Sequence, residues 1–193
     1  NVARAQQFTS VLLPDGRIFI AGGISGGPDG GPSEIYDPAD PAAGWVQGPA
    51  MANSRTYHSS VILLRDGSIL AGGDPQVGGN PTSHERYFPD YFTVARPTIA
   101  NAPSSVAYGV PFTIDTPEAT TIAECVLLHP GSVTHGFNMR QRGIALEITG
   151  GGGGSIDVSS PPNSNLAPPG WVLLFLLDGN RTPSEGRWIR LTP

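Results

Sequence analysis

Short apolar runs, separated by glycine, proline, asparagine and aspartate, recur along the whole chain. No run approaches the ~18–20 uninterrupted apolar residues of a membrane span, and the run at 171–177 is far too short for one. Runs of this kind with turn residues between them indicate many short β-strands joined by tight turns. The pattern therefore predicts an all-β protein.

The first half of the chain contains one pattern twice. Residues 10–23 read as an apolar strand, an Asp-Gly hairpin, a second apolar strand and a Gly-Gly pair, and residues 60–73 repeat that order. The first copy continues into two further short strands, at 34–38 and 44–47. This order resembles the kelch repeat, which forms one four-stranded blade of a β-propeller. The paired glycines suit a place where backbones crowd together, because a Cβ atom would clash there.

The second copy lacks its last strand. It has a third strand at 84–89 but no Trp-bearing fourth one. A closing blade of a propeller has this form when the missing strand comes from elsewhere in the ring. Two blades cannot close a ring, and stacked repeats need about three or more neighbours to bury their faces. We therefore expect further blades outside this chain, in the same protein or in a separate one.

The second half of the chain predicts an immunoglobulin-like β-sandwich. Its short apolar runs have no helical period and are separated by Pro, Gly and Asn turns. The runs are 98–107, 111–116, 122–129, 143–149, 155–158, 171–178 and 186–191. The expected organisation is thus the last blades of an incomplete kelch-type propeller over 1–95, followed by an immunoglobulin-like (early-set) sandwich over 96–193.

Composition excludes several classes of function. The net charge is −5 and every basic residue is arginine, which argues against nucleic acid or an anionic membrane as the main partner. The single cysteine, Cys125, can form no internal disulfide and lies in an apolar run as a buried thiol would. The glycine pairs carry no nucleotide-binding fingerprint, and no serine has a nucleophile-elbow pattern. Acyl, phosphoryl and hydride transfer therefore have no candidate site.

Three side chains form a candidate metal site: Tyr57, His58 and His135. Tyr57 and His58 stand at the start of a blade's first strand, which in a propeller lies nearest the central axis. Successive residues of an ideal strand point to opposite faces, so both reach one ion only if the strand start is irregular. Two imidazoles and a phenol form a mixed nitrogen and oxygen set that suits copper(II) better than structural zinc or calcium. Taken singly, each residue also has an ordinary structural explanation, and His84 and His129 are expected to be structural or surface residues.

The sequence around these residues resembles the C-terminal part of the galactose oxidase/glyoxal oxidase family of copper-radical oxidases. The resemblance rests on 55–59, Arg96-Pro97, and Thr134-His135 followed by Gln141-Arg142. The order of parts also matches, with terminal kelch blades before an immunoglobulin-like domain whose hairpin reaches into the propeller axis. The resemblance implies copper held by Tyr57, as axial ligand and base, and by His58 and His135. The family's Tyr-Cys radical ligand has no counterpart here, and Cys125 does not match its cysteine.

The resemblance implies a secreted or cell-surface oxidase that oxidises an alcohol or aldehyde with O2 and releases H2O2. This chain would supply three copper ligands but no radical, so that by itself it would be inactive. Its expected partners are the missing N-terminal blades and a small alcohol or aldehyde substrate. A second hypothesis is a non-enzymatic kelch/immunoglobulin-like module that binds glycan or cell wall. The two differ in whether upstream blades carry a Tyr and a Cys that can approach each other.

Overall fold

The computed structural model describes residues 2, 4, 6–24, 31–74 and 82–193. The described part is built of β-strands and two 3-10 helices, η1 (Pro41–Ala43) and η2 (Asp90–Thr93). No helix in it is long and apolar enough to cross a membrane. The chain is all-β, as predicted from its apolar runs.

Two compact units make up the chain, and both are discontinuous in sequence. The first unit comprises 1–64, 68–88 and 131–141, and the second comprises 65–67, 89–130 and 142–193. A hairpin from the second half of the sequence thus belongs to the unit that contains the kelch-like repeats. The expected domain boundary at residue 96 stays a prediction.

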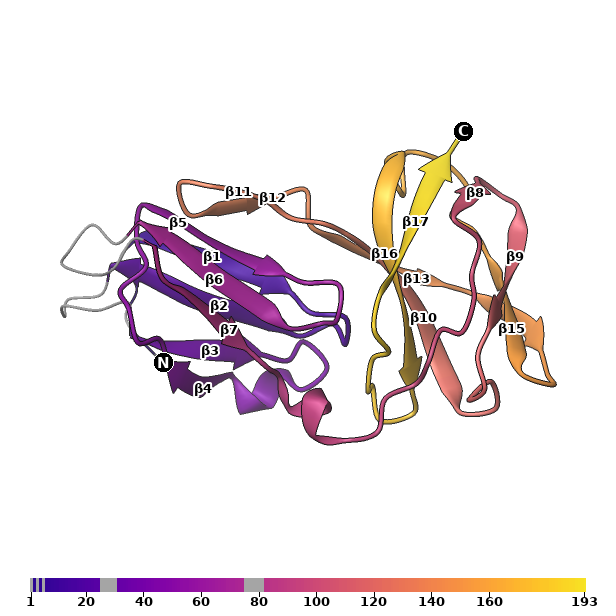
Figure 1. Ribbon diagram of the computed structural model, residues 1–193, viewed down its shortest axis with the longest axis horizontal. Coiled ribbons are helices and arrows are strands. Elements are labelled where there is room, and N and C mark those ends of the chain that lie inside the picture. Colours follow the sequence, from indigo (N-terminus) through magenta and orange to yellow (C-terminus); the bar gives the residue numbers. More distant parts are fainter. Residues whose placement is uncertain (1, 3, 5, 25–30, 75–81) are drawn as a thin grey trace. The chain divides into compact units, whose positions relative to one another are not determined.

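The first unit contains two antiparallel sheets and a separate hairpin (Figure 1). The four-stranded sheet has the order β1-β2-β3-β4, and its strands are β1 (Gln6–Leu12), β2 (Ile18–Ile24), β3 (Pro32–Tyr36) and β4 (Trp45–Ala50). The three-stranded sheet has the order β5-β6-β7, and its strands are β5 (His58–Leu63), β6 (Ile69–Asp74) and β7 (His84–Tyr87). The two sheets correspond to a complete blade and a blade without its fourth strand.

The two sheets share one hydrophobic core. Its buried members are Val11, Leu13, Phe19, Ala21, Val61, Ile69 and Ala71. Phe19 of β2 stacks on Tyr87 of β7 with ring centroids 4.9 Å apart. Because each sheet covers the apolar face of the other, neither sheet would bury its hydrophobic residues alone.

Glycines stand where the backbones approach most closely. A Cβ atom on Gly22 (φ 72°) would lie 2.7 Å from the carbonyl oxygen of Arg55, in the segment that leads into the second sheet. A Cβ atom on Gly73 (φ 102°) would lie 2.7 Å from the carbonyl oxygen of His58. Both positions also have a left-handed backbone that side chains disfavour. The crowding expected at the Gly-Gly pairs is thus present at Gly22 and Gly73.

The second unit is a sandwich of two sheets. One has five strands in the order β13-β10-β16-β17-β8, with β17 and β8 parallel, and the other has three in the order β14-β15-β9. The strands are β8 (Ser105–Ala107), β9 (Pro111–Asp115), β10 (Ile122–His129), β13 (Arg142–Leu146), β14 (Ile148–Gly151), β15 (Ser155–Ser159), β16 (Gly170–Asp178) and β17 (Arg187–Thr192).

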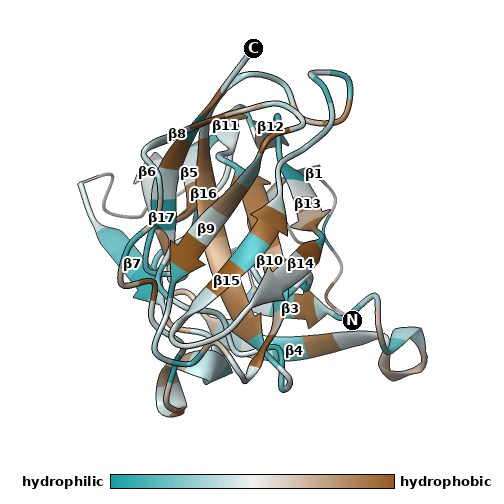
Figure 2. Cartoon of the chain, turned by 90° about the vertical axis from the view of Figure 1, so that its right-hand side faces the viewer, coloured by the Kyte–Doolittle hydropathy of each residue, from teal (hydrophilic) through white to brown (hydrophobic). Residues whose placement is uncertain are grey.

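The sandwich core follows from the period-2 alternation of its strands. Buried Ile156 and Val158 of β15 alternate with more exposed neighbours, and Figure 2 shows the same alternation as hydrophobic and hydrophilic bands along this strand. Cys125 is fully buried in this core, and burial raises the pKa of its thiol from 9.0 to about 12. It acts as a small hydrophobe, as expected.

Two predicted strands differ from those observed. The run 98–107 forms a strand only at Ser105–Ala107, because it contains Pro103, which has no N–H group for a ladder. The run 143–149 is split between β13 in the five-stranded sheet and β14 in the three-stranded sheet. One apolar run therefore crosses from one layer of the sandwich to the other at Glu147.

Candidate metal centre

Tyr57 and His58 lie where a turn becomes a strand. Tyr57 is the last residue of the turn, and His58 is the first residue of β5. The turn is closed by Ser59, whose N–H and hydroxyl groups donate to the carbonyl oxygen of Thr56 at 3.3 and 2.6 Å. The pair thus stands at an irregular strand start, where consecutive side chains can point to the same side.

A buried arginine holds the segment that leads into this turn. The Arg55 side chain is fully buried, and its guanidinium donates to the carbonyl oxygen of Gly73 at 2.8 Å and to Ser83 Oγ at 2.7 Å. It also forms an ion pair with Glu85 at 3.4 Å. The Arg55 carbonyl oxygen accepts the N–H of Gly23 at 2.8 Å. Arg55 therefore ties the second sheet to the first, two residues before Tyr57.

Glu85 supports the same segment from the other side. Its carboxylate accepts the N–H groups of Ala52 at 2.6 Å and Asn53 at 3.1 Å, besides its ion pair with Arg55. Hydrogen bonds in which one partner is charged are stronger than hydrogen bonds between neutral groups. Backbone and side-chain contacts together leave the 52–56 segment little freedom.

His135 occupies the tip of a tight hairpin formed by β11 (Ser132–Thr134) and β12 (Phe137–Met139). The loop is His135-Gly136, and both residues have positive φ, 53° and 81°. Two left-handed residues are the signature of a type I′ turn, which matches the twist of a two-stranded ribbon. Histidine tolerates this conformation better than most residues, and the glycine adopts it freely.

Side chains of the hairpin anchor it to β1 and β5, which are edge strands of the two sheets. Asn138 Nδ2 and Gln141 Nε2 both donate to the carbonyl oxygen of Ser10 at 3.0 Å, and Gln141 Oε1 accepts the N–H of Leu12 at 2.7 Å. Asn138 Nδ2 also lies 3.4 Å from the carbonyl oxygen of Val61 in β5. These contacts satisfy backbone groups on the free edge of β1 and hold the hairpin over β1 and β5.

The hairpin brings His135 to Tyr57 and His58. The ring centroids are 4.3 Å apart for Tyr57 and His58, 4.9 Å for Tyr57 and His135, and 4.9 Å for the two histidines. Tyr57 is half-buried and both histidines are exposed. All three predicted site residues are thus neighbours in the first unit.

The donor atoms in this group fit a copper ion. The Thr134 hydroxyl lies 2.6 Å from His135 Nδ1, so that Nε2 is the ring nitrogen left for a metal. The described residues contain no cluster of three or more His, Cys, Asp or Glu side chains suited to a metal, and the third donor of this group is the phenol of Tyr57. Two imidazole nitrogens and one phenol oxygen are the ligand types expected for copper(II) rather than for a hard cation.

Sequence reasoning missed the residues that build the site around its ligands. Arg55, Glu85, Thr134, Asn138 and Gln141 were assigned no individual role. His-Gly between the short runs 132–134 and 137–139 is a usable hairpin signal, because a type I′ turn needs positive φ at both positions. No local pattern marked the contacts of Arg55 with Glu85 or of Gln141 with Leu12. The other histidines lie apart from the site: His84 is exposed, and His129 is buried in β10.

Comparison with known proteins gives the affiliation of the chain. A family model described as "Galactose oxidase-like, Early set domain" matches residues 96–191. A galactose oxidase of Gibberella zeae is 36% identical over 202 residues, which cover 95% of this chain and 29% of the relative. The chain belongs to the galactose oxidase/glyoxal oxidase family. It corresponds to the C-terminal region of this family's proteins.

Other relatives in the galactose oxidase/glyoxal oxidase family include enzymes named for aldehydes and alcohols. "Aldehyde oxidase GLOX1" of Arabidopsis thaliana is 32% identical over 215 residues, covering 94% of this chain and 35% of that protein. A solved structure of a fungal alcohol oxidase of the AA5 family, in complex with copper, superposes with a TM-score of 0.81 and 26% identity. That match covers 96% of this chain and 42% of the solved one. The chain spans less than half the length of each of these relatives.

Proposed function

We propose that Tyr57, His58 and His135 bind a copper ion, and that the chain contributes this part of a copper-radical oxidase. The proposal rests above all on one observation: the three rings lie mutually within 4.9 Å although His135 comes from a distant part of the sequence. The copper in the related alcohol oxidase structure supports the choice of metal. The activities for which these relatives are named support an alcohol or an aldehyde as substrate.

The overall reaction would convert an alcohol and O2 into an aldehyde and H2O2, or an aldehyde, water and O2 into a carboxylic acid and H2O2. Bound copper would supply one-electron redox chemistry and reactivity toward O2. His58 and His135 would each present a neutral imidazole nitrogen, with the Thr134 hydroxyl fixing the His135 ring. Tyr57 would take the proton of the substrate hydroxyl, because a nearby cation favours the phenolate form that acts as a base.

The radical group would come from blades outside this chain. Cys125 is unsuited to a Tyr-Cys crosslink, because it is fully buried in the core of the second unit and its raised pKa of about 12 keeps the thiol protonated. Those blades, and a secreted or cell-surface location, are part of the proposal. This chain alone would hold copper without completing the reaction.

Copper(II) titration followed by electron paramagnetic resonance tests the proposed ligands. We expect one copper per chain with a tetragonal nitrogen and oxygen signal. His58→Ala and His135→Ala should each weaken binding and remove one nitrogen from the hyperfine pattern. His84→Ala is the matched control, since His84 is exposed and lies outside the ring group. Absence of the signal, or a signal unchanged in both ligand variants, would contradict the proposal.

A further inference from the structure

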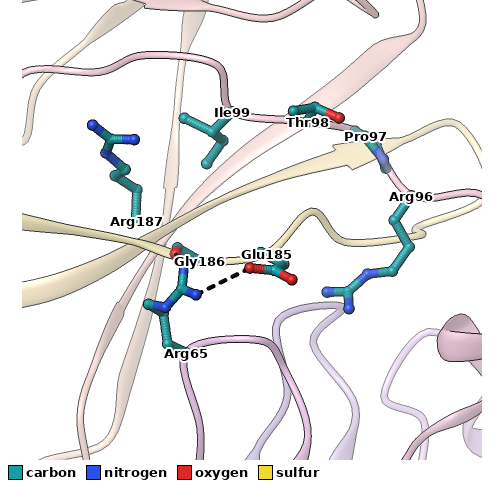
Figure 3. A pocket seen from close by; sticks show the side chains of 8 residues that line it. All are labelled: Arg65, Arg96, Pro97, Thr98, Ile99, Glu185, Gly186 and Arg187. Carbon is teal, nitrogen blue, oxygen red and sulfur yellow. Dashed lines mark hydrogen bonds and ion pairs between the residues drawn. The ribbon is translucent and has the colours of Figure 1, made fainter.

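A second candidate site lies in the second unit and shares no residue with the ring group. A cavity of about 360 Å3 is lined by three arginines, Arg65, Arg96 and Arg187, and by Glu185, with residues 97–99 as a further wall (Figure 3). The chain has only eleven basic residues and a net charge of −5. Three of those basic residues therefore gather around one cavity of an acidic chain.

Close backbone contact builds one side of the cavity. The N–H of Gly186 donates to the carbonyl oxygen of Arg65 at 2.7 Å. A Cβ atom on Gly186 would lie 2.8 Å from that oxygen and 2.8 Å from the ring of Phe175, so only glycine fits here. Gly186 directly precedes Arg187 in the chain. Its hydrogen bond to Arg65 therefore holds the backbone of Arg65 next to the start of β17, where Arg187 lies.

Arg96 forms a structural wall of the cavity. Its guanidinium donates to the carbonyl oxygens of Pro183 at 2.7 Å and Ser184 at 2.6 Å, and lies 4.6 Å from the ring centroid of Phe92. Glu185 and Asp66 both interact with its charge. Arg96 thus has little capacity left for a ligand.

Arg65 and Arg187 retain that capacity. Arg65 pairs with Glu185 at 3.2 Å, but the two side chains are 56% and 61% exposed, and exposed pairs of this kind contribute little to stability. Arg187 is exposed, and its side chain has no hydrogen bond or ion pair within the described part of the chain. Figure 3 shows its side chain beside Ile99, on a different part of the cavity lining from the Arg65–Glu185 pair.

We propose that this cavity binds a small organic acid, whose carboxylate replaces that of Glu185 at Arg65 and whose other polar groups are contacted by Arg187. The Glu185 carboxylate is already held at Arg65 and marks the position for a ligand of the same chemistry. Guanidinium groups match the planar carboxylate through paired hydrogen bonds. The volume lies at the lower end of the range for small-molecule pockets, which suits a single sugar-acid ring.

The test uses glucuronate as probe and glucose as the uncharged control of the same ring size, with binding to the intact protein measured by isothermal titration calorimetry. Glucuronate should bind saturably at one site, and glucose should not. Arg187→Ala should weaken glucuronate binding at least about tenfold, because it removes a charge-assisted contact. Glu185→Gln should tighten it, because the internal competitor is lost.

Arg190→Ala is the control variant and should leave glucuronate binding unchanged. Arg190 is an exposed arginine of the same strand, β17, and does not line the cavity. Circular dichroism melting should show all variants folded. The proposal is overturned if glucuronate does not saturate, if glucose binds as well, or if Arg187→Ala and Glu185→Gln leave the affinity unchanged. None of these outcomes bears on the proposed copper site, because none of the variants changes Tyr57, His58 or His135.

Discussion

At the scale of single residues, the three proposed ligands depend on neighbours that have no proposed contact with the metal. Arg55 and Glu85 hold the backbone that ends in Tyr57, through four hydrogen-bond partners and one ion pair. Thr134 holds the imidazole of His135 through its hydroxyl group. A buried charge such as Arg55 is costly unless it is paired, which explains why Glu85 accompanies it.

Thr134→Val should lower the affinity for copper(II) about tenfold, because loss of a group that orients a metal-bound imidazole typically costs ten- to a hundredfold. Valine keeps the size and β-branching of threonine but removes the hydroxyl that contacts His135 Nδ1. The nitrogen hyperfine couplings should change as well. Thr134→Ser retains the hydroxyl and should restore both properties. An unchanged Val variant would show that the 2.6 Å contact does not orient the ring.

At the scale of elements, the 131–141 hairpin joins the two halves of the candidate site. Its tip carries His135 in a left-handed conformation, and its base is anchored by Asn138 and Gln141 on β1. The tip also lies tightly on β1: a Cβ atom on Gly136 would be 2.9 Å from Gln7 Cα. The position of His135 therefore depends on a glycine beside it.

Gly136→Ala should destabilise the fold and weaken copper binding together. The left-handed backbone costs about 1–2 kcal/mol for a residue with a side chain, and the contact with Gln7 adds to this, because backbone cannot move aside as a flexible side chain can. Thermal unfolding and copper(II) titration measure the two effects.

Gly109→Ala is the matched control for that change. Gly109 has a similar φ of 70°, and its added Cβ would meet nothing within 4 Å. It should lower stability by the backbone cost alone and leave copper binding intact. Equal effects of the two substitutions on copper binding would argue against a positioning role for the tip.

At the scale of the whole molecule, the first unit has one four-stranded and one three-stranded sheet. The chain also spans less than half the length of its relatives in the galactose oxidase/glyoxal oxidase family. The proposed ligand set of two histidines and one tyrosine contains no Tyr-Cys crosslinked pair. Binding and turnover should therefore be separable in this protein.

The chain of residues 1–193, loaded with copper(II), should bind the metal but release no H2O2 from a primary alcohol or an aldehyde in a peroxidase-coupled assay. The physical reason is that the proposed site would supply copper ligands and a base, but no group that accepts the second electron of a two-electron oxidation. A version that includes the proposed additional blades should release peroxide, and Tyr57→Phe in that version should abolish most of the activity. Turnover by residues 1–193 alone would refute this division of roles.

The sequence by itself determined which segments become strands and which residues can act as ligands. Alternating apolar positions, Asp-Gly turns and paired glycines are local signals, because strand geometry and positive φ depend on neighbouring residues. They were enough for two blade-like sheets, a sandwich, and the choice of Tyr57, His58 and His135 as candidates.

Only the tertiary structure decided which of these elements meet. The single apolar run at 143–149 divides between two sheets, and the hairpin at 131–141 packs with the blades rather than with the sandwich. Arg55 pairs with Glu85, which lies 30 residues further along the chain, beyond β5 and β6. Such contacts depend on packing between distant segments, which no local pattern encodes. The meeting of His135 with Tyr57 and His58 has the same origin: residue chemistry identified the candidate ligands, and the packed hairpin brought them together.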